Sequence, residues 1–173
     1  MHLNPESDHW LMDNTHLQRH VNNAIVYNIW QYFQITQDMQ VLSFYGGEII
    51  IEIARFWASI ATYIPELDRY EIVGVMGPDE YHDAYPNADK PGLNNNGYTN
   101  LMVAFVMEQA LNLQHLLPRQ DWKYLHKKLG IEERELVTWQ KISRRMKLVF
   151  HDDGIISQFE GYENLKEFDW AGY

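Results

Sequence analysis

A short run of titratable residues at positions 79–83, Asp-Glu-Tyr-His-Asp, is the part of the sequence best suited to chemistry. It follows a Gly-Pro pair at 77–78, and these two residue types favour a tight turn. A carboxyl group held in such a turn beside apolar walls has its charged form disfavoured, which raises its pKa and allows it to donate a proton. The run can therefore supply a general acid, although acidic residues in a solvated loop produce the same pattern.

Other chemistries fit the same residues less well. Asp79, His82 and Asp83 offer oxygen and imidazole ligands, but their spacing matches no recognised metal motif and no second cluster of ligands follows, so we expect no metal. A Ser-His-Asp triad has less support, since no serine stands in a Gly-x-Ser-x-Gly turn. The absence of cysteine excludes disulfides, thiol catalysis and cysteine-ligated zinc.

Three consecutive asparagines, Asn94, Asn95 and Asn96, provide amide donors and acceptors that suit sugar hydroxyls. Asparagine also tolerates left-handed backbone and caps helices. We expect at least one of the three to cap the helix that follows.

The elements on either side indicate that the segment containing these residues is ordered. Positions 76–97 form a 22-residue stretch with three Gly, three Pro, four Asn and no period, which predicts a loop. An alternating strand is expected over 69–75 before it, and a helix with a clear apolar stripe follows and stops at Pro118. Loops of this length in compact domains are usually functional or disordered, and the flanking elements favour a functional one.

The rest of the chain reads as mainly helical. A capping box of Thr15 and Gln18 predicts a helix that runs to about Thr36, and an apolar helix then continues to Pro65. Asp121 is expected to cap a short helix that ends near Gly130. The segment 131–147 begins with acidic and ends with basic residues, as the helix dipole favours, and a strand is expected over 155–159.

Composition limits the classes of partner. The chain has 173 residues, enough for one domain, and a formal net charge of −10, which repels nucleic acid and anionic membrane surfaces. No run of about 18 apolar residues and no signal-peptide pattern is present, so we expect a cytoplasmic protein.

Five stretches, taken in order, resemble the catalytic domain of glycoside hydrolase family 65, which contains the maltose, trehalose and kojibiose phosphorylases. They are HVNNAIVYNIWQYFQITQD, YGGEIIIEIARFWAS, RYEIVGVMGPDEYHD, NNNGYTN and SQFEGYENLKEFDW. The resemblance implies a mainly α fold in which 1–173 form a single, partial (α/α)6 barrel with one or two short strands and a long catalytic loop. A partial barrel exposes apolar helix faces, so association through them or a homo-oligomer is expected.

The resemblance implies inverting phosphorolysis of an α-linked glucosyl disaccharide to β-glucose 1-phosphate, in which Glu80 is the general acid. Inorganic phosphate is then a co-substrate and no cofactor is needed. An inverting hydrolase requires a second carboxylate roughly 6.5–9.5 Å away to activate water, whereas phosphate arrives as an anion and one acid suffices. An inverting α-glucosidase or trehalase-like hydrolase of the same family shares this acid and is the first alternative. A catalytically inactive fragment that acts only through association is the second.

The same resemblance assigns substrate binding to neighbours of Glu80 and to the asparagine run. We expect Asp79, Tyr81, His82, Asn95 and Asn96 to contact the sugar. The linkage and the acceptor stay open among kojibiose, trehalose, trehalose phosphate and nigerose.

Overall fold

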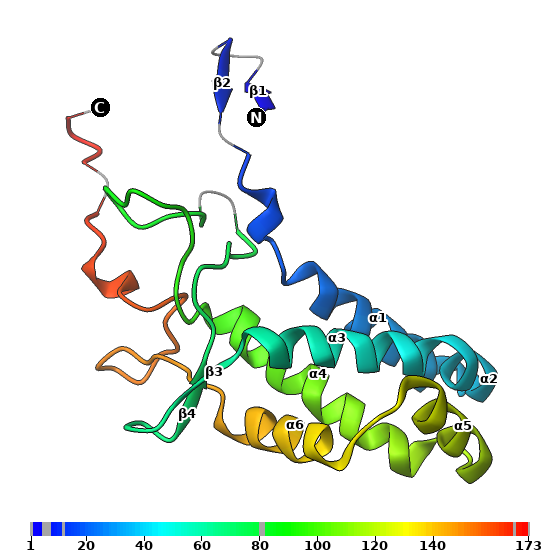
Figure 1. The fold of residues 1–173 in the computed structure, drawn as a ribbon. Helices are drawn as coiled ribbons and strands as arrows, with labels where there is room; N and C mark the ends of the chain where they lie inside the picture. Colours follow the sequence, from blue (N-terminus) through cyan, green and yellow to red (C-terminus); the bar gives the residue numbers. More distant parts are fainter. Residues whose placement is uncertain (1, 5–7, 12, 80–81, 168, 173) are drawn as a thin grey trace.

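The computed structural model describes residues 2–4, 8–11, 13–79, 82–167 and 169–172, and the part it describes is mainly helical (Figure 1). Two short antiparallel hairpins accompany the helices. The α-helices and strands are β1 (His2–Asn4), β2 (His9–Leu11), α1 (Val21–Thr36), α2 (Met39–Val41), α3 (Gly47–Ile60), β3 (Thr62–Ile64), β4 (Arg69–Glu71), α4 (Gly97–Leu116), α5 (Arg119–Leu129) and α6 (Glu133–Arg145). A π-helical turn (Leu42–Gly46) joins α2 to α3, and 3-10 turns cover Thr15–Leu17 and Tyr162–Asn164.

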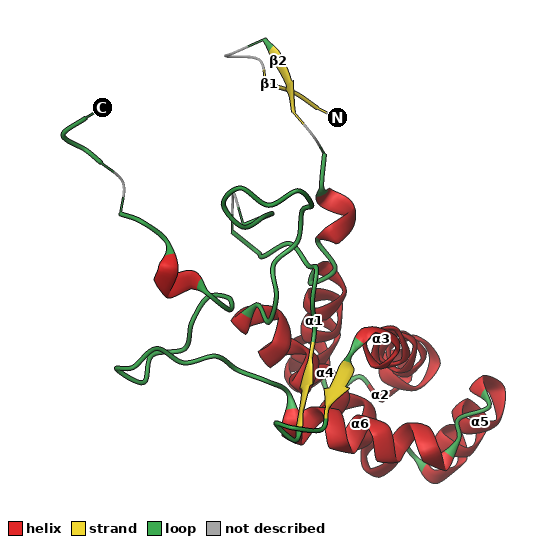
Figure 2. Ribbon diagram, turned by 60° about the vertical axis from the view of Figure 1, so that its left-hand side comes forward, coloured by secondary structure: helices red, strands yellow, loops and turns green. Residues whose placement is uncertain are grey.

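Helix α4 is the centre of the packing. It contacts α1, α3, α5 and α6, and Figure 2 shows α1, α3 and α6 gathered around it. Its inward residues Val103, Met107 and Leu113 are fully buried, as are the large side chains of Trp57 on α3 and Trp139 on α6. Burying a side chain of this size contributes about 1.5–3 kcal/mol, so α4 is anchored on several sides and its first turn has a fixed position.

Helix α6 is held to α3 by a paired charge. The Arg55 guanidinium donates to both oxygens of Glu135, at 2.7 Å and 3.1 Å. Glu135 also completes a capping box with Glu132, whose backbone N–H donates to it at 2.8 Å. The hydrogen bond from Arg55 lowers the pKa of the Glu135 carboxyl. The acidic start and basic end predicted for this helix are confirmed.

We expect Glu135→Gln to lower the free energy of unfolding by about 1–2 kcal/mol at neutral pH, roughly 2–8 °C in Tm, because a charge-assisted bond is lost. A folded-state pKa below the ordinary value means that this stabilisation exists above the ordinary carboxyl pKa and disappears as pH falls through the lowered one. Thermal melts at several pH values should therefore converge in acid. Glu133→Gln, at an exposed site on the same helix, is the control. Equal losses in the two variants would refute the role of the pair.

Several predicted element boundaries are wrong. The capping box at Thr15 does not form, because the Thr15 hydroxyl donates to Asp13 at 2.6 Å, and α1 begins only at Val21. The apolar helix ends at Ile60 rather than at Pro65, since β3 follows it. The strand expected over 69–75 is limited to β4, and the one expected over 155–159 is reduced to an isolated bridge at Ile156.

The N-terminus of α5 also differs from expectation. Pro118, not Asp121, is the N-cap residue, and the Asp121 carboxylate accepts a hydrogen bond from Ser43 at 2.8 Å. This bond joins the first turn of α5 to the π-helical turn before α3. The Asp121 side chain, which its local spacing predicts to cap α5, thus binds Ser43, a residue 78 positions away in the sequence.

Apolar side chains lie exposed along α1 and the π-helical turn. Ile35 is 80% exposed, and Phe44 and Tyr45 are more than half exposed. The expected association through exposed helix faces stays a prediction. In the described ranges, no helix combines the length and the apolar character that a membrane crossing requires.

Candidate active site

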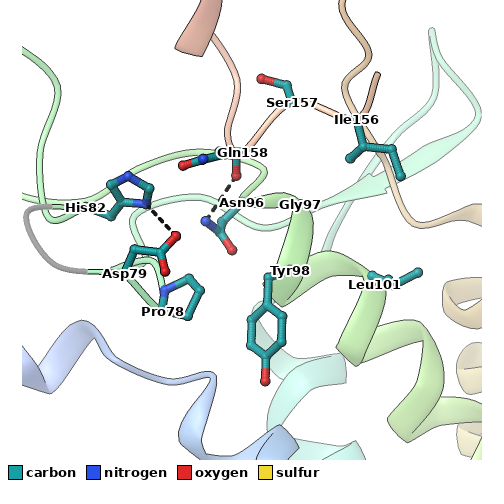
Figure 3. A pocket seen from close by; sticks show the side chains of 10 residues that line it. All are labelled: Pro78, Asp79, His82, Asn96, Gly97, Tyr98, Leu101, Ile156, Ser157 and Gln158. Atoms are coloured by element: carbon teal, nitrogen blue, oxygen red, sulfur yellow. Dashed lines mark hydrogen bonds and ion pairs between the residues drawn. The ribbon is translucent and has the colours of Figure 1, made fainter. Parts of the chain in front are cut away.

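A pocket of about 240 Å³ opens at the amino end of α4 (Figure 3). Three segments that are distant in sequence form its walls: the loop after β4, the first turns of α4, and the segment that follows α6. The lining residues are Pro78, Asp79, His82, Asn96, Gly97, Tyr98, Leu101, Ile156, Ser157 and Gln158. The loop predicted to be functional therefore borders a pocket.

The loop is fixed at its base by backbone hydrogen bonds. Val75 and Leu93 exchange N–H···O bonds of 3.0 Å and 2.7 Å, which brings the two ends of the loop together. The N–H of Met76 donates to the carbonyl of Leu17 at 3.0 Å, so the segment before α1 also supports it. Gly77 N–H donates to the His82 carbonyl at 2.8 Å, which joins the start of the loop to His82. The tight turn expected from Gly77 and Pro78 stays a prediction.

Asp79 and His82 face each other at the pocket wall. Asp79 Oδ2 lies 3.8 Å from His82 Nδ1, which allows an ion pair when the imidazole is protonated. The Asp79 side chain is 67% exposed, whereas that of His82 is 19% exposed. The His82 ring packs edge-on against Phe159 at a centroid distance of 5.4 Å, so the C-terminal segment sets its orientation. A carboxylate and an imidazole at this position can accept and donate hydrogen bonds to a polar ligand.

Glu80 and Tyr81 lie outside the residues that the structure describes. Their neighbours in sequence, Asp79 and His82, both line the pocket. The assignments of Glu80 as general acid and of Tyr81 as a substrate contact stay predictions.

Asn96 caps α4 and also lines the pocket. Its Oδ1 accepts from the N–H of Thr99 at 2.9 Å, which confirms that one of the three asparagines is a helix cap. Its Nδ2 donates to the Gln158 carbonyl at 3.1 Å, an interaction drawn in Figure 3. Both ends of the amide are bonded to protein, so Asn96 gives the pocket its shape and retains one further N–H for a ligand.

Asn95 is placed differently. It is fully buried, has a left-handed backbone (φ 50°), and is absent from the pocket wall. Its Nδ2 donates to Glu160 at 2.7 Å and its Oδ1 accepts from Asn100 at 3.2 Å. The structure thus makes Asn95 a bridge between the loop and the C-terminal segment. The contact between Asn95 and the sugar stays a prediction.

One side of the pocket is not predicted from the sequence. A strand is expected over 155–159, but Ile156, Ser157 and Gln158 follow an irregular path across the amino end of α4. The Gln158 carbonyl accepts from the N–H of Gly97 at 2.9 Å. The motif SQFEGYENLKEFDW, which is part of the family resemblance, points to this segment. It does not indicate which of its residues line the pocket.

The described residues hold no group of three or more His, Asp or Glu side chains that could bind a metal ion. The pocket contains both a polar wall and an apolar one. Tyr98, Leu101 and Ile156 form the apolar side, opposite Asp79 and His82 (Figure 3). A sugar ring has polar hydroxyl edges and apolar C–H faces, and these two walls suit it.

The mainly helical fold is shared by a solved structure from the human microbiome that carries the name of a kojibiose phosphorylase. The TM-score is 0.73 at 23% identity, over 88% of this chain and 21% of that one. The family model for the glycosyl hydrolase family 65 central catalytic domain matches residues 1–173. The chain belongs to glycosyl hydrolase family 65.

Curated relatives agree with this membership. Trehalose 6-phosphate phosphorylase of Lactococcus lactis is 39% identical over 173 residues, which are 100% of this chain and 21% of the relative. Kojibiose phosphorylase of Halothermothrix orenii is 37% identical over 161 residues, covering 91% of this chain and 20% of the relative. An uncharacterised glycosyl hydrolase of Mycobacterium tuberculosis is 46% identical over 173 residues, which are all of this chain and 13% of the relative.

The chain therefore spans about an eighth to a fifth of the length of the curated relatives it matches. Its family and its mainly helical fold agree with those implied by the resemblance. Closure of helices into an (α/α)6 barrel stays a prediction.

Proposed function

We propose that the protein carrying this chain is an α-glucoside phosphorylase that inverts the configuration of the anomeric carbon, with Glu80 as general acid. One observation carries the proposal: Asp79 and His82, which flank Glu80 and Tyr81 in the sequence, line a pocket in a chain that belongs to glycosyl hydrolase family 65. The relatives named as phosphorylases of trehalose 6-phosphate and kojibiose support phosphorolysis over other chemistry.

In the proposed reaction, the Glu80 carboxyl gives its proton to the oxygen that bridges the two sugars. The bond between this oxygen and the anomeric carbon breaks, and the acceptor sugar leaves as an alcohol. A phosphate oxygen forms a bond to the anomeric carbon from the opposite face, which gives β-glucose 1-phosphate. The Glu80 carboxylate regains a proton before the next turnover, so a pKa raised towards the working pH serves this role.

The pocket walls divide the task of holding the sugar. Asp79 and His82 offer a carboxyl group and an imidazole to the hydroxyls, and Asn96 has one amide hydrogen left. Tyr98 and Leu101 present apolar surface to a C–H face of the ring. No further cofactor is proposed, because phosphate itself is the nucleophile.

The competing hydrolase and fragment proposals make different predictions. In the hydrolase, water replaces phosphate as the nucleophile. In the fragment, the isolated 173 residues have no turnover, which we expect because the chain spans only part of its relatives. Activity therefore has to be measured on the protein over its full encoded length, with the isolated chain assayed beside it.

The test is incubation of the full-length protein with kojibiose, trehalose, trehalose 6-phosphate, nigerose and maltose, each with and without inorganic phosphate. We expect one of them to be consumed only when phosphate is present, with one sugar phosphate formed per bond cleaved. Equal cleavage without phosphate would instead establish the hydrolase. No cleavage of any α-glucoside would overturn the enzymatic proposal.

A further inference from the structure

The segment after α6 is tied to the asparagine run by a closed set of hydrogen bonds that centres on Glu160. The Glu160 N–H donates to the Asn94 carbonyl at 3.0 Å, and the Glu160 carbonyl accepts from the Tyr85 hydroxyl at 2.8 Å. The same hydroxyl accepts from the Asn94 N–H at 3.1 Å. Three segments of chain thus meet at the backbone of one residue.

The Glu160 side chain makes a second set of contacts, with Lys147 and Asn95. Its Oε1 accepts from Lys147 Nζ at 2.8 Å, and its Oε2 accepts from Asn95 Nδ2 at 2.7 Å. The Lys147 side chain is only 18% exposed, while that of Glu160 is 43% exposed. An isolated surface pair of this kind contributes little to stability, but here one partner of the carboxylate is a fully buried amide. The contact therefore controls geometry more than global stability.

Asn95 needs such a support because its backbone is left-handed, with φ 50°. Its N–H donates to the Ile72 carbonyl at 2.8 Å, and its Oδ1 accepts from Asn100 Nδ2 at 3.2 Å. Asn100 Nδ2 in turn donates to the Lys147 carbonyl at 2.7 Å. A non-glycine residue holds this conformation when its surroundings determine it, and Glu160 and Lys147 are part of those surroundings.

The pocket begins at the next residue. Asn96, which follows Asn95, lines the pocket and donates through Nδ2 to the carbonyl of Gln158. Gln158 lies two positions before Glu160 and also lines the pocket. The Glu160 contacts thus hold the α4 wall and the C-terminal wall in register, without Glu160 itself reaching the pocket.

The charges near Glu160 favour its ionised form. The hydrogen bond from Lys147, and after it the one from Asn95, lower the pKa of the Glu160 carboxyl. Glu71, whose Oε2 lies 3.5 Å from Asn95 Nδ2, and Glu163 are the nearby acidic groups. Burial raises the pKa of the Tyr85 hydroxyl, so it stays neutral. The ion pair with Lys147 is accordingly present at neutral pH.

We propose that Glu160, held by Lys147, is a positioning residue for the pocket, which fixes Asn95 and through it Asn96 and Gln158 without touching substrate. The expected loss of kcat/KM rests on the proposed phosphorylase function, whereas the positioning of the pocket walls does not. A displacement of about 1 Å in groups that orient a substrate can cost about 10²-fold in rate.

The test uses three variants of the full-length protein: Glu160→Gln, Lys147→Met and the two combined. We expect each single change to lower kcat/KM by about 10–100-fold, mostly in kcat, and the combined change to cost no more than either alone, because both remove one interaction. The control is Glu48→Gln with Lys128→Met, an exposed ion pair between α3 and α5. This ion pair lies towards the far end of the 20-residue helix α4, roughly 30 Å from the pocket (Figure 1). The control variant should therefore leave kcat/KM unchanged.

Hydrogen exchange of the same variants provides a readout that does not depend on activity. The amide N–H groups of Gly97 and Glu160, which bridge the two walls, should exchange faster in Glu160→Gln while those of α6 do not change. Exchange of these amides at the wild-type rate in Glu160→Gln would overturn the proposal. Variants with a lower Tm but a wild-type kcat/KM would also overturn it. If the wild-type protein cleaves no α-glucoside, the proposed function fails, and hydrogen exchange alone decides whether Glu160 positions the walls.

Discussion

Glu80→Gln is expected to lower kcat for the natural disaccharide by about 10²–10⁴-fold, since the glutamine amide is too weak an acid to protonate the bridging oxygen. The substitution is nearly isosteric, so KM should change little. The measurement is the initial rate of sugar-phosphate release, with Asp89→Asn as the control, because Asp89 is an exposed acidic residue of the same loop.

A substrate with a better leaving group separates acid catalysis from other roles of Glu80. α-Glucosyl fluoride needs no protonation of an oxygen, so Glu80→Gln should cleave it at a rate close to that of the wild type when phosphate is supplied. Full activity of Glu80→Gln on the disaccharide would remove Glu80 from the mechanism. Equal loss on both substrates would assign it to binding or folding instead.

Gly77→Ala is expected to lower kcat/KM by about 10²-fold or more with only a small change in Tm. A Cβ at this position would lie 2.8 Å from the Cβ of His82, which is closer than packed atoms allow, and 3.1 Å from Asn96 Nδ2, which is a tight contact. His82 and Asn96 both line the pocket, so the strain has to displace a pocket wall. Kinetics on the purified, folded variant measure the effect.

Gly130→Ala is the matched control for this glycine. Gly130 ends α5 in a left-handed conformation (φ 57°) with open space around its Cβ position. Alanine there should cost stability, about 1 kcal/mol, and leave kcat/KM at the wild-type value. A Gly77→Ala variant with wild-type kcat/KM would show that the close packing at Gly77 does not set the geometry of the pocket.

The sequence indicated the helices well where local signals act alone. The apolar stripe of α4, its stop before Pro118 and the charge asymmetry of α6 are all confirmed, because periodicity and helix-dipole matching are properties of one segment. The predictions failed where a tertiary contact captured a side chain. Asp121 binds Ser43 instead of capping α5, and β3 replaces the end of a helix where Tyr63 packs against Tyr70 of β4.

The candidate site was predicted in part for the same reason. The cap at Asn96 depends on a neighbour three positions away, Thr99, and is confirmed. The contact of Glu160 with Asn95 joins residues 65 positions apart, and no local pattern signals it. The family resemblance included both segments, but a motif match says that residues belong together without saying which atoms meet.

The anomeric configuration of the first product tests the central claim most directly. We expect ¹H and ³¹P NMR spectra of the full-length protein with disaccharide and phosphate, recorded during the first turnovers, to show β-glucose 1-phosphate as the sugar phosphate formed. Release of α-glucose 1-phosphate would contradict displacement by phosphate from the face opposite to the proton donor.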